Sequence, residues 1–143
     1  MYLQGPEPGE LQGVDADFSD FSDQALTLAA IAPYANSPVR VRGVRHIRGQ
    51  ECDRLYAIER NLGKMKVPCD VGEDGFTVYP SQPQPASVES FDDHRVAMAF
   101  ALTGLRAEGI AIENPSCCRK TFENYFDVLG QVIQQNRQGM KIH

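Results

Sequence analysis

Cationic residues that could hold an anion gather at three points of the sequence. Arg54 closes the segment Gln50–Arg54, Arg95 closes Asp92–Arg95, and Lys120 ends a short basic pair. These points lie near predicted helix starts, where free backbone N–H groups and the helix dipole favour negative charge. Arginine offers a hydrogen-bonding fork and lysine a point charge, so the three cations together suit a ligand that carries a carboxylate and a phosphate.

Surface ion pairing is the alternative interpretation of the same residues. Glu51 would then pair with Arg54, and Asp93 would pair with Arg95 or Arg119. Such exposed pairs contribute little to stability and bind no ligand. Spacing alone leaves both interpretations open.

Asp23 lies where a helix is predicted to begin. Ser22 or Asp23 is expected to cap that helix, because short polar side chains accept hydrogen bonds from its first free N–H groups. A capping carboxylate that faces a ligand hydroxyl can also act as a general base. His94 has the same two interpretations, a hydrogen-bonded structural histidine or a catalytic one.

Composition excludes several classes of function. The chain has 143 residues, 14 Lys and Arg against 19 Asp and Glu, and a net charge of −5, so we expect no nucleic-acid partner. No apolar run approaches the roughly 18 residues of a membrane span, and the first residues lack the features of a signal peptide. The four cysteines form no CxxC pair and the three histidines are scattered, so we expect reduced thiols, no metal site and a cytoplasmic protein.

Hydrophobic periodicity predicts alternating helices and strands, which is typical of an α/β fold. Pro33 is expected to end the first helix near Ile31–Ala32, because its ring clashes with the carbonyl four residues back. Two strands joined by a GEDG turn are expected to form a hairpin. The predicted helices are 24–35, 51–63, 93–106 and 120–135, and the predicted strands are 39–44, 65–71, 76–80 and 109–114.

The second half of the sequence repeats the apolar pattern of the first at an offset of 70 residues. This offset aligns Asp93 with Asp23 and Ala111 with Val41. A period of this length predicts repeat units packed side by side, with helices buried behind mixed sheets.

Three segments, in this order, carry a resemblance to a known family. They are Gln50-Glu-Cys-Asp-Arg54, Asp93-His-Arg-Val-Ala-Met-Ala99 and Arg119-Lys-Thr-Phe122. Together they resemble the 5-enolpyruvylshikimate-3-phosphate (EPSP) synthase family, over about residues 2–135. The resemblance implies two domains, each of three βαβαββ units forming a partial inverse α/β barrel. This chain would supply two units from the C-terminal side, residues 1–72 and 73–143.

The resemblance also implies a reaction, 3-phosphoshikimate 1-carboxyvinyl transfer. The carboxyvinyl group of phosphoenolpyruvate moves to the 5-hydroxyl of shikimate 3-phosphate and phosphate leaves, with no metal or organic cofactor. Asp23 would accept the hydroxyl proton and Glu51 would move a proton at the methylene carbon. The other implied site residues are His46 and Gln50, with Asp23, for shikimate 3-phosphate, Arg54, Arg95 and Lys120 for phosphoenolpyruvate, and His94 as a support.

Three features depart from the family pattern. Ser22 stands where proline is common, which is a minor change because serine caps a helix well. Gln50 stands where lysine is common, so this contact carries no charge. The chain is also much shorter than the family's enzymes and lacks the N-terminal portion that supplies the other domain, so we expect it alone to be inactive. The loss of neighbouring repeats would expose apolar helix faces, around Leu26–Ile31 or Val96–Leu102, and this predicts self-association.

Two other functions stay open on the sequence. One is a stand-alone anion-binding or regulatory module with the same fold. The other is the sister enzyme that moves enolpyruvyl to a UDP-aminosugar, although the Asp93–Ala99 and Arg119–Phe122 segments favour the shikimate branch.

Overall fold

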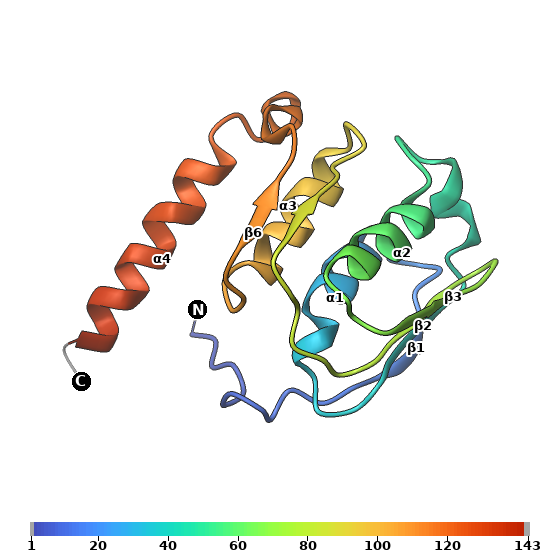
Figure 1. Ribbon diagram of the computed structural model, residues 1–143, viewed down its shortest axis with the longest axis horizontal. Helices are drawn as coiled ribbons and strands as arrows, with labels where there is room; N and C mark the ends of the chain where they lie inside the picture. Colours follow the sequence, from blue (N-terminus) through green and yellow to red (C-terminus); the bar gives the residue numbers. More distant parts are fainter. Residues whose placement is uncertain (1, 142–143) are drawn as a thin grey trace.

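A computed structural model describes residues 2–141 of the chain, and side chains as far as residue 135. Helices alternate with short strands along the chain (Figure 1). The strands are β1 (Asp15–Asp17), β2 (Val39–Arg42), β3 (Cys69–Val71), β4 (Phe76–Val78), β5 (Ala86–Val88) and β6 (Ile110–Ile112). The α-helices are α1 (Ala25–Ile31), α2 (Arg54–Lys64), α3 (His94–Thr103) and α4 (Tyr125–Lys141), and the 3-10 turns are η1 (Ser22–Gln24), η2 (Ala32–Tyr34), η3 (Arg45–Gly49) and η4 (Pro115–Lys120).

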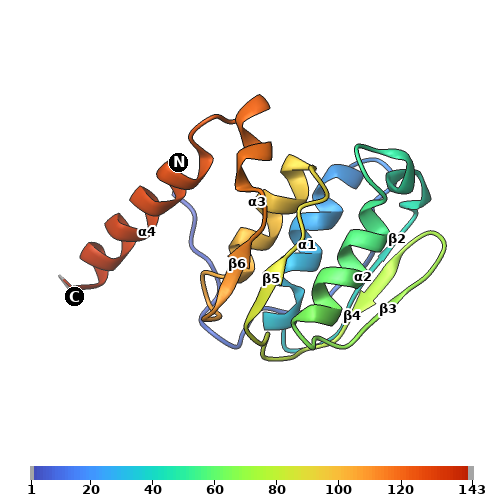
Figure 2. The same cartoon turned by 45° about the horizontal axis from the view of Figure 1, so that its top comes forward.

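The strands form two sheets, which Figure 2 shows from a second angle. The first has the order β1-β2-β4-β3, with β1 parallel to β2 and the other pairs antiparallel. The second pairs β5 with β6 in parallel. The predicted division of the chain into units 1–72 and 73–143 falls in the turn between β3 and β4. It would separate two strands that pair with each other, and it stays a prediction.

The strands of the two halves correspond at an offset of 71 residues. β1 begins at Asp15 and β5 at Ala86, and β2 begins at Val39 and β6 at Ile110. The predicted alignment of Ala111 with Val41 is therefore wrong by one position. Burial gives the physical reason: Val41 is buried and Ala111 is exposed, because successive strand residues point to opposite faces.

Local signals placed several boundaries correctly. α1 ends at Ile31 and Pro33 lies in η2, as the proline predicts. The hairpin is confirmed, with the Gly72 N–H donating to the Gly75 carbonyl at its turn. The last helix begins later than predicted: Pro115 begins the 3-10 turn that ends at Lys120, and α4 starts only at Tyr125.

α1 and α3 pack against each other. Their facing side chains are buried, so the expectation of exposed faces around Leu26–Ile31 and Val96–Leu102 is wrong for most of these residues. The buried members are Leu26, Ala29, Ala30, Val96, Ala97, Ala99 and Phe100. Self-association stays a prediction, but the helix faces that suggested it are mostly buried within the chain. Among the described residues, no helix is long and apolar enough to cross a membrane.

Asn61 ties α2 to the segment after β5. Its side-chain amide donates to the Glu89 carbonyl (3.0 Å) and accepts from the Glu89 N–H (2.9 Å), and the residue is fully buried. Asn61→Ala leaves both backbone groups without this partner, so we expect the free energy of unfolding to fall by about 1–3 kcal/mol. Urea denaturation measures this change; the exposed Glu59→Ala on the same helix is the control, and an equal effect of both substitutions would contradict the assignment.

Candidate functional site

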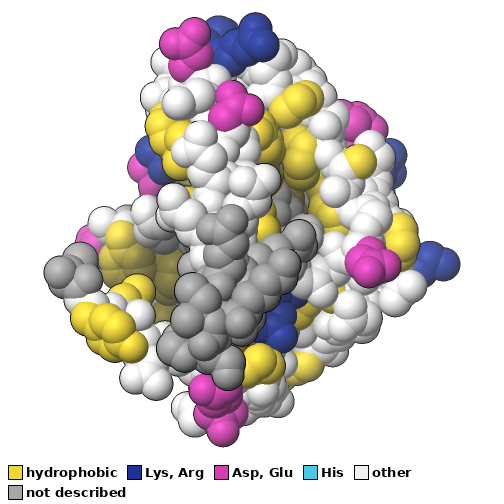
Figure 3. Space-filling model, turned by 90° about the vertical axis from the view of Figure 1, so that its left-hand side faces the viewer, with side chains coloured by type: hydrophobic (Ala, Val, Ile, Leu, Met, Phe, Trp, Pro, Cys, Tyr) yellow, Lys and Arg dark blue, Asp and Glu magenta, His cyan; other side chains and the backbone are white. Residues whose placement is uncertain are grey.

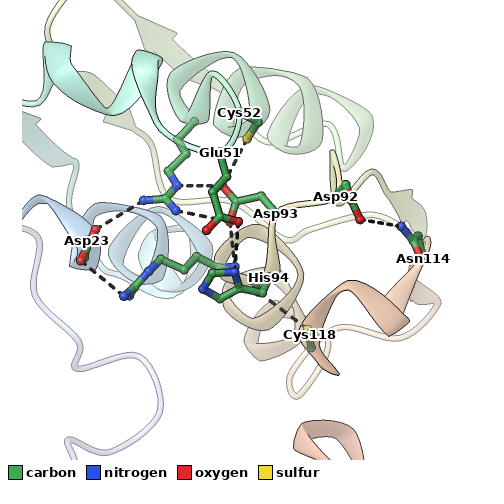
Figure 4. A network of polar contacts seen from close by, with 10 residues as sticks. Asp23, Glu51, Cys52, Asp92, Asp93, His94, Asn114 and Cys118 are labelled. Carbon is green, nitrogen blue, oxygen red and sulfur yellow. Dashed lines mark hydrogen bonds and ion pairs between the residues drawn. The ribbon is translucent and has the colours of Figure 1, made fainter. Parts of the chain in front are cut away.

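The N-terminal ends of α2 and α3 converge with η1, and Figure 4 shows the network of polar contacts among their residues. Asp53 caps α2 by accepting from the Tyr56 N–H (3.0 Å), and Asp93 caps α3 by accepting from the Arg95 N–H (2.9 Å). The prediction that Asp93 opens a helix is confirmed. The two caps fix Arg54 and Arg95 in the first turns of their helices, so both guanidinium groups reach the same region.

A buried ion pair joins the two helix ends. Arg54 Nε lies 2.8 Å from Asp93 Oδ2, and Arg54 Nη2 lies 3.4 Å from Asp93 Oδ1. The two side chains are only 4% and 0% exposed. Burial alone raises the pKa of the Asp93 carboxyl, but the hydrogen bond and charge of Arg54 outweigh it and hold that pKa below its ordinary value.

Asp23 lies between two guanidinium groups. Its Oδ1 accepts from Arg54 Nη1 and its Oδ2 contacts Arg95 Nη2, each at 3.4 Å. The predicted capping by Ser22 or Asp23 is wrong, because both residues lie inside η1 and α1 starts without a side-chain cap. The Asp23 side chain remains 52% exposed, so its carboxylate is fixed by two cations and still open to a ligand.

Glu51 and His94 form a further polar contact of the site. Glu51 Oε2 lies 3.2 Å from His94 Nδ1, as Figure 4 shows. Behind them, Cys52 donates from its thiol to Asp93 Oδ2 (3.4 Å). Burial and the neighbouring Asp93 carboxylate raise the pKa of Cys52 to about 12, so this thiol stays protonated.

The remaining predicted site residues lie at the edges. His46 Nε2 and Ser22 Oγ are 2.8 Å apart, which links η3 to η1. Gln50 follows η3 and Lys120 ends η4; both are exposed, and neither makes a hydrogen bond or ion pair with another described side chain. The structure therefore groups Asp23, Glu51, Arg54, His94 and Arg95 and leaves the edge residues outside this network.

A pocket of about 270 Å³ opens beside this network. Asp23, His94 and Arg95 line its charged side, and Met98 and Tyr125 line an apolar side. Thr121, the neighbour of Lys120, also borders it. The pocket thus combines an acid, a cation and a histidine in one opening.

The predicted surface ion pairs are wrong, because these residues pair with other partners. Arg54 is buried against Asp93 rather than paired with Glu51, and Glu51 contacts His94. The Arg95 side chain pairs with Asp23, while Asp93 receives only its backbone N–H. Helix packing brings together residues that spacing along the chain had kept apart.

Glu51, Asp93 and His94 also approach a metal-binding geometry, with one ligand atom of each within 4.8 Å of the others. Both oxygens of Asp93, however, already accept hydrogen bonds from Arg54. The positive charge of that guanidinium disfavours a second cation at the same carboxylate. The pairing with Arg54 therefore disfavours a metal ion at Asp93.

The lowered pKa of Asp93 predicts a dependence of stability on pH. The Asp93 carboxylate stabilises the fold fully above the pKa of an unfolded aspartate, about 3.9. This stabilisation is lost as pH falls through the lower pKa that Asp93 has in the folded state. We expect the unfolding free energy to fall more steeply between about pH 5 and about pH 3 in the natural chain than in the Arg54→Met/Asp93→Leu variant. Urea denaturation across this pH range measures both slopes, and equal slopes would contradict the pairing.

Sequence reasoning missed two parts of the site. It gave Cys52 no role, although this thiol supports Asp93, and it did not anticipate the contact of Ser22 with His46. The Asp93–Arg54 pair spans 39 residues, a separation that local pattern does not encode. The only available signal was an acid immediately before a strongly apolar helix, which favours a buried and paired carboxylate.

The fold and the site together define an α/β protein in which two arginines, three acids and a histidine meet at converging helix ends. A family model described as EPSP synthase (3-phosphoshikimate 1-carboxyvinyltransferase) matches residues 2–129. The chain belongs to this family.

Relatives agree with the family match. The chain is 47% identical over 134 residues to a 3-phosphoshikimate 1-carboxyvinyltransferase of Trichormus variabilis, covering 94% of this chain and 32% of that protein. It is 48% identical over 125 residues to the protein of that name from a Nostoc species, covering 87% of this chain and 29% of the other. The chain thus spans about a third of the length of these relatives.

A solved structure of EPSP synthase from Acinetobacter baumannii shares the fold. It superposes with a TM-score of 0.78 at 24% identity, over 85% of this chain and 30% of that chain. The predicted α/β class is confirmed at this level, and the family resemblance drawn from the three sequence segments is confirmed with it.

Proposed function

We propose that this chain is a portion, from the C-terminal side, of an enzyme that transfers the carboxyvinyl group of phosphoenolpyruvate to the 5-hydroxyl of shikimate 3-phosphate. The observation that carries the proposal is the half-exposed Asp23 carboxylate between the guanidinium groups of Arg54 and Arg95. An acid fixed beside two cations suits a reaction in which a hydroxyl loses its proton while an anionic donor is held nearby.

The residues divide the proposed reaction among them. Asp23 takes the proton of the 5-hydroxyl while the hydroxyl oxygen forms a bond to the central carbon of phosphoenolpyruvate. Glu51, fixed by His94, gives a proton to the methylene carbon and takes one back when phosphate leaves. Arg54, Arg95 and Lys120 hold the carboxylate and phosphate, and His46 and Gln50 contact shikimate 3-phosphate.

Asp93 explains how Arg54 keeps its position. Both of its oxygens bind Arg54, so this guanidinium is oriented before a ligand arrives. Preorganised donors lose less entropy and less solvation when charge develops in the transition state. Asp93 therefore acts as a positioning residue for Arg54 in the proposed site.

The chain supplies only part of this site. We propose that the N-terminal portion of the same enzyme provides the facing domain, and that closure of the two domains excludes water. The present chain would then contribute two βαβαββ units and have little activity alone. The relatives matched above carry the shikimate name rather than that of the UDP-aminosugar enzyme, which supports the shikimate branch.

A chimera tests the role of Arg95. In it, this chain replaces the matching third of the Trichormus variabilis relative. We expect Arg95→Ala to raise the KM for phosphoenolpyruvate by roughly 10- to 100-fold, because a hydrogen bond to a charged group contributes about 1.5–3 kcal/mol. Steady-state phosphate release measures it. Arg106→Ala, an exposed arginine beyond the end of α3, is the control, and an unchanged KM in Arg95→Ala would contradict the assignment.

A further inference from the structure

Two thiols lie next to each other in η4, and the proposed reaction uses neither of them. Cys117 and Cys118 are only 7% and 2% exposed. A single buried cysteine usually acts as a small hydrophobic residue. Two thiols side by side have a further property, because together they can bind one soft atom.

The two thiols are close enough to influence each other. Burial, and after it the neighbouring Cys117 thiol, raise the pKa of Cys118 to about 11, so the Cys118 thiol stays protonated. This thiol donates to the His94 carbonyl at 3.8 Å, as the dashed line in Figure 4 shows. A thiol is a weak donor, so a partner that binds sulfur covalently would displace this contact.

Direct linkage of the two sulfur atoms is disfavoured by the backbone. Neighbouring Cα atoms are about 3.8 Å apart, whereas a disulfide needs about 4.4–6.8 Å. An atom that bridges the two sulfurs relaxes this restriction, because two bonds span a longer gap than one. The pair is therefore better suited to a bridging atom than to oxidation.

A zinc ion needs more ligands than this position offers. Structural zinc takes four protein ligands and catalytic zinc takes three. Among the residues whose side chains are described, the group of three possible metal ligands is Glu51, Asp93 and His94, which includes neither cysteine. Trivalent arsenic that already carries an organic group needs only two thiols, and it is soft, as sulfur is.

The surroundings of the pair fit an aromatic substituent on that arsenic. Cys118 lines a pocket of about 200 Å³ together with Tyr125 and Phe126. These two rings lie edge to face with centroids 5.2 Å apart and pack against the thiols. A third ring in the pocket would make the same type of contact. Condensation of two protonated thiols also adds no charge to these apolar surroundings.

We propose that Cys117 and Cys118 form a dithiol site for trivalent arsenicals that carry an aromatic group. The oxide of such an arsenical, R–As=O, condenses with both thiols. Two As–S bonds form, the As=O bond breaks, and the oxygen leaves with the two thiol protons as one water molecule; no atom is oxidised or reduced. The group R lies in the pocket beside Tyr125 and Phe126, and Cys118 gives up its contact with the His94 carbonyl.

Binding of phenylarsine oxide to the isolated chain tests the site. By native mass spectrometry we expect one phenylarsine group per chain, and the same in the variant Cys52→Ser/Cys69→Ser, which keeps only the adjacent pair. Cys117→Ala and Cys118→Ala should each weaken binding by about 10²- to 10⁴-fold, because the second sulfur no longer binds within the same molecule. Equal affinity of the natural chain and Cys117→Ala would overturn the proposal, as would loss of binding in Cys52→Ser/Cys69→Ser.

Release of the arsenical distinguishes two bound sulfurs from one. We expect dimercaptopropanol to remove the phenylarsine group from the natural chain, because it offers two thiols to the same arsenic. Mercaptoethanol at the same thiol concentration should leave most of it bound. Equal release by the two reagents would overturn the two-sulfur site.

The place of the aromatic group is tested separately. Hydrophobic side chains also show on the side of the molecule that Figure 3 faces, so adhesion of the ring to other surface is the competing explanation. We expect Phe126→Leu to weaken phenylarsine oxide by about 2- to 10-fold, the usual contribution of an aromatic pair, and to leave methylarsine oxide unchanged. Equal effects on the two arsenicals would overturn this placement.

A consequence for turnover rests on the proposed function. Lys120, which would hold phosphoenolpyruvate, ends the same turn two residues after Cys118. We expect phenylarsine oxide to stop phosphate release by the chimera, dimercaptopropanol to restore it, and Cys117→Ala to resist the arsenical. Binding without inhibition, or equal inhibition of Cys117→Ala, would overturn this consequence. The binding readouts need no turnover, so an inactive chimera that binds the arsenical would contradict the proposed function alone.

Discussion

Asp93→Ala is expected to lower the free energy of unfolding by about 3–5 kcal/mol, the range for removing one partner of a buried ion pair. Arg54 is 3% exposed and would keep its charge without the carboxylate that now binds it through two hydrogen bonds. The Arg95 N–H would lose its cap and the Cys52 thiol its acceptor. Urea denaturation followed by far-ultraviolet circular dichroism measures the loss.

Two further variants make this result specific. Asp92→Asn removes the charge of the neighbouring exposed acid but keeps an oxygen for the hydrogen bond from Asn114 and suits the positive φ of 55° at this position, so we expect a change below about 1 kcal/mol. Arg54→Met/Asp93→Leu replaces the pair by apolar groups and should recover much of the stability, because no buried charge is left unpaired. A loss of less than about 1 kcal/mol in Asp93→Ala would show that the pair is not buried as described.

Asp23→Asn in the chimera is expected to reduce kcat by about 10²- to 10⁴-fold, the usual contribution of a positioned general base. The amide has nearly the shape of the carboxylate but cannot take the proton of the 5-hydroxyl. Arg54 and Arg95 would remain close by, so we expect a smaller effect on the KM for phosphoenolpyruvate. Phosphate release at saturating substrates measures kcat.

The control for this variant lies in the same loop. Asp20→Asn changes an exposed acid three residues earlier and should leave kcat within about threefold. Retention of kcat in Asp23→Asn would remove Asp23 from the role of base and leave it as a structural partner of the two arginines.

Local features were predictable because they depend on neighbouring residues. Pro33 ended α1 through its own ring, the GEDG turn joined two strands, and Asp93 capped α3. The wrong expectations concern signals that compete locally: Asp23 could equally cap a helix or bind cations, and packing against α2 and α3 decided between these roles.

Long-range features were not predictable for a different reason. The offset of 70 differed from the strand offset by one residue, and a slip of one exchanges the two faces of a strand. Val41 and Ala111 are both apolar, so their hydrophobicity could not reveal the slip. Their burial does reveal it, because Val41 is buried and Ala111 is exposed. The Arg54–Asp93 pair likewise depends on how α2 and α3 meet, which no local spacing fixes.

The most direct measurement is phosphate release from phosphoenolpyruvate in the presence of shikimate 3-phosphate, by this chain alone and by the chimera. We expect no turnover above background from the isolated chain, because half of a closing site neither surrounds the substrates nor excludes water. We expect the chimera to turn over, with a rate that requires Asp23. Turnover by the isolated chain, or a folded chimera without activity, would contradict the assignment of this chain as one part of a carboxyvinyl transfer site.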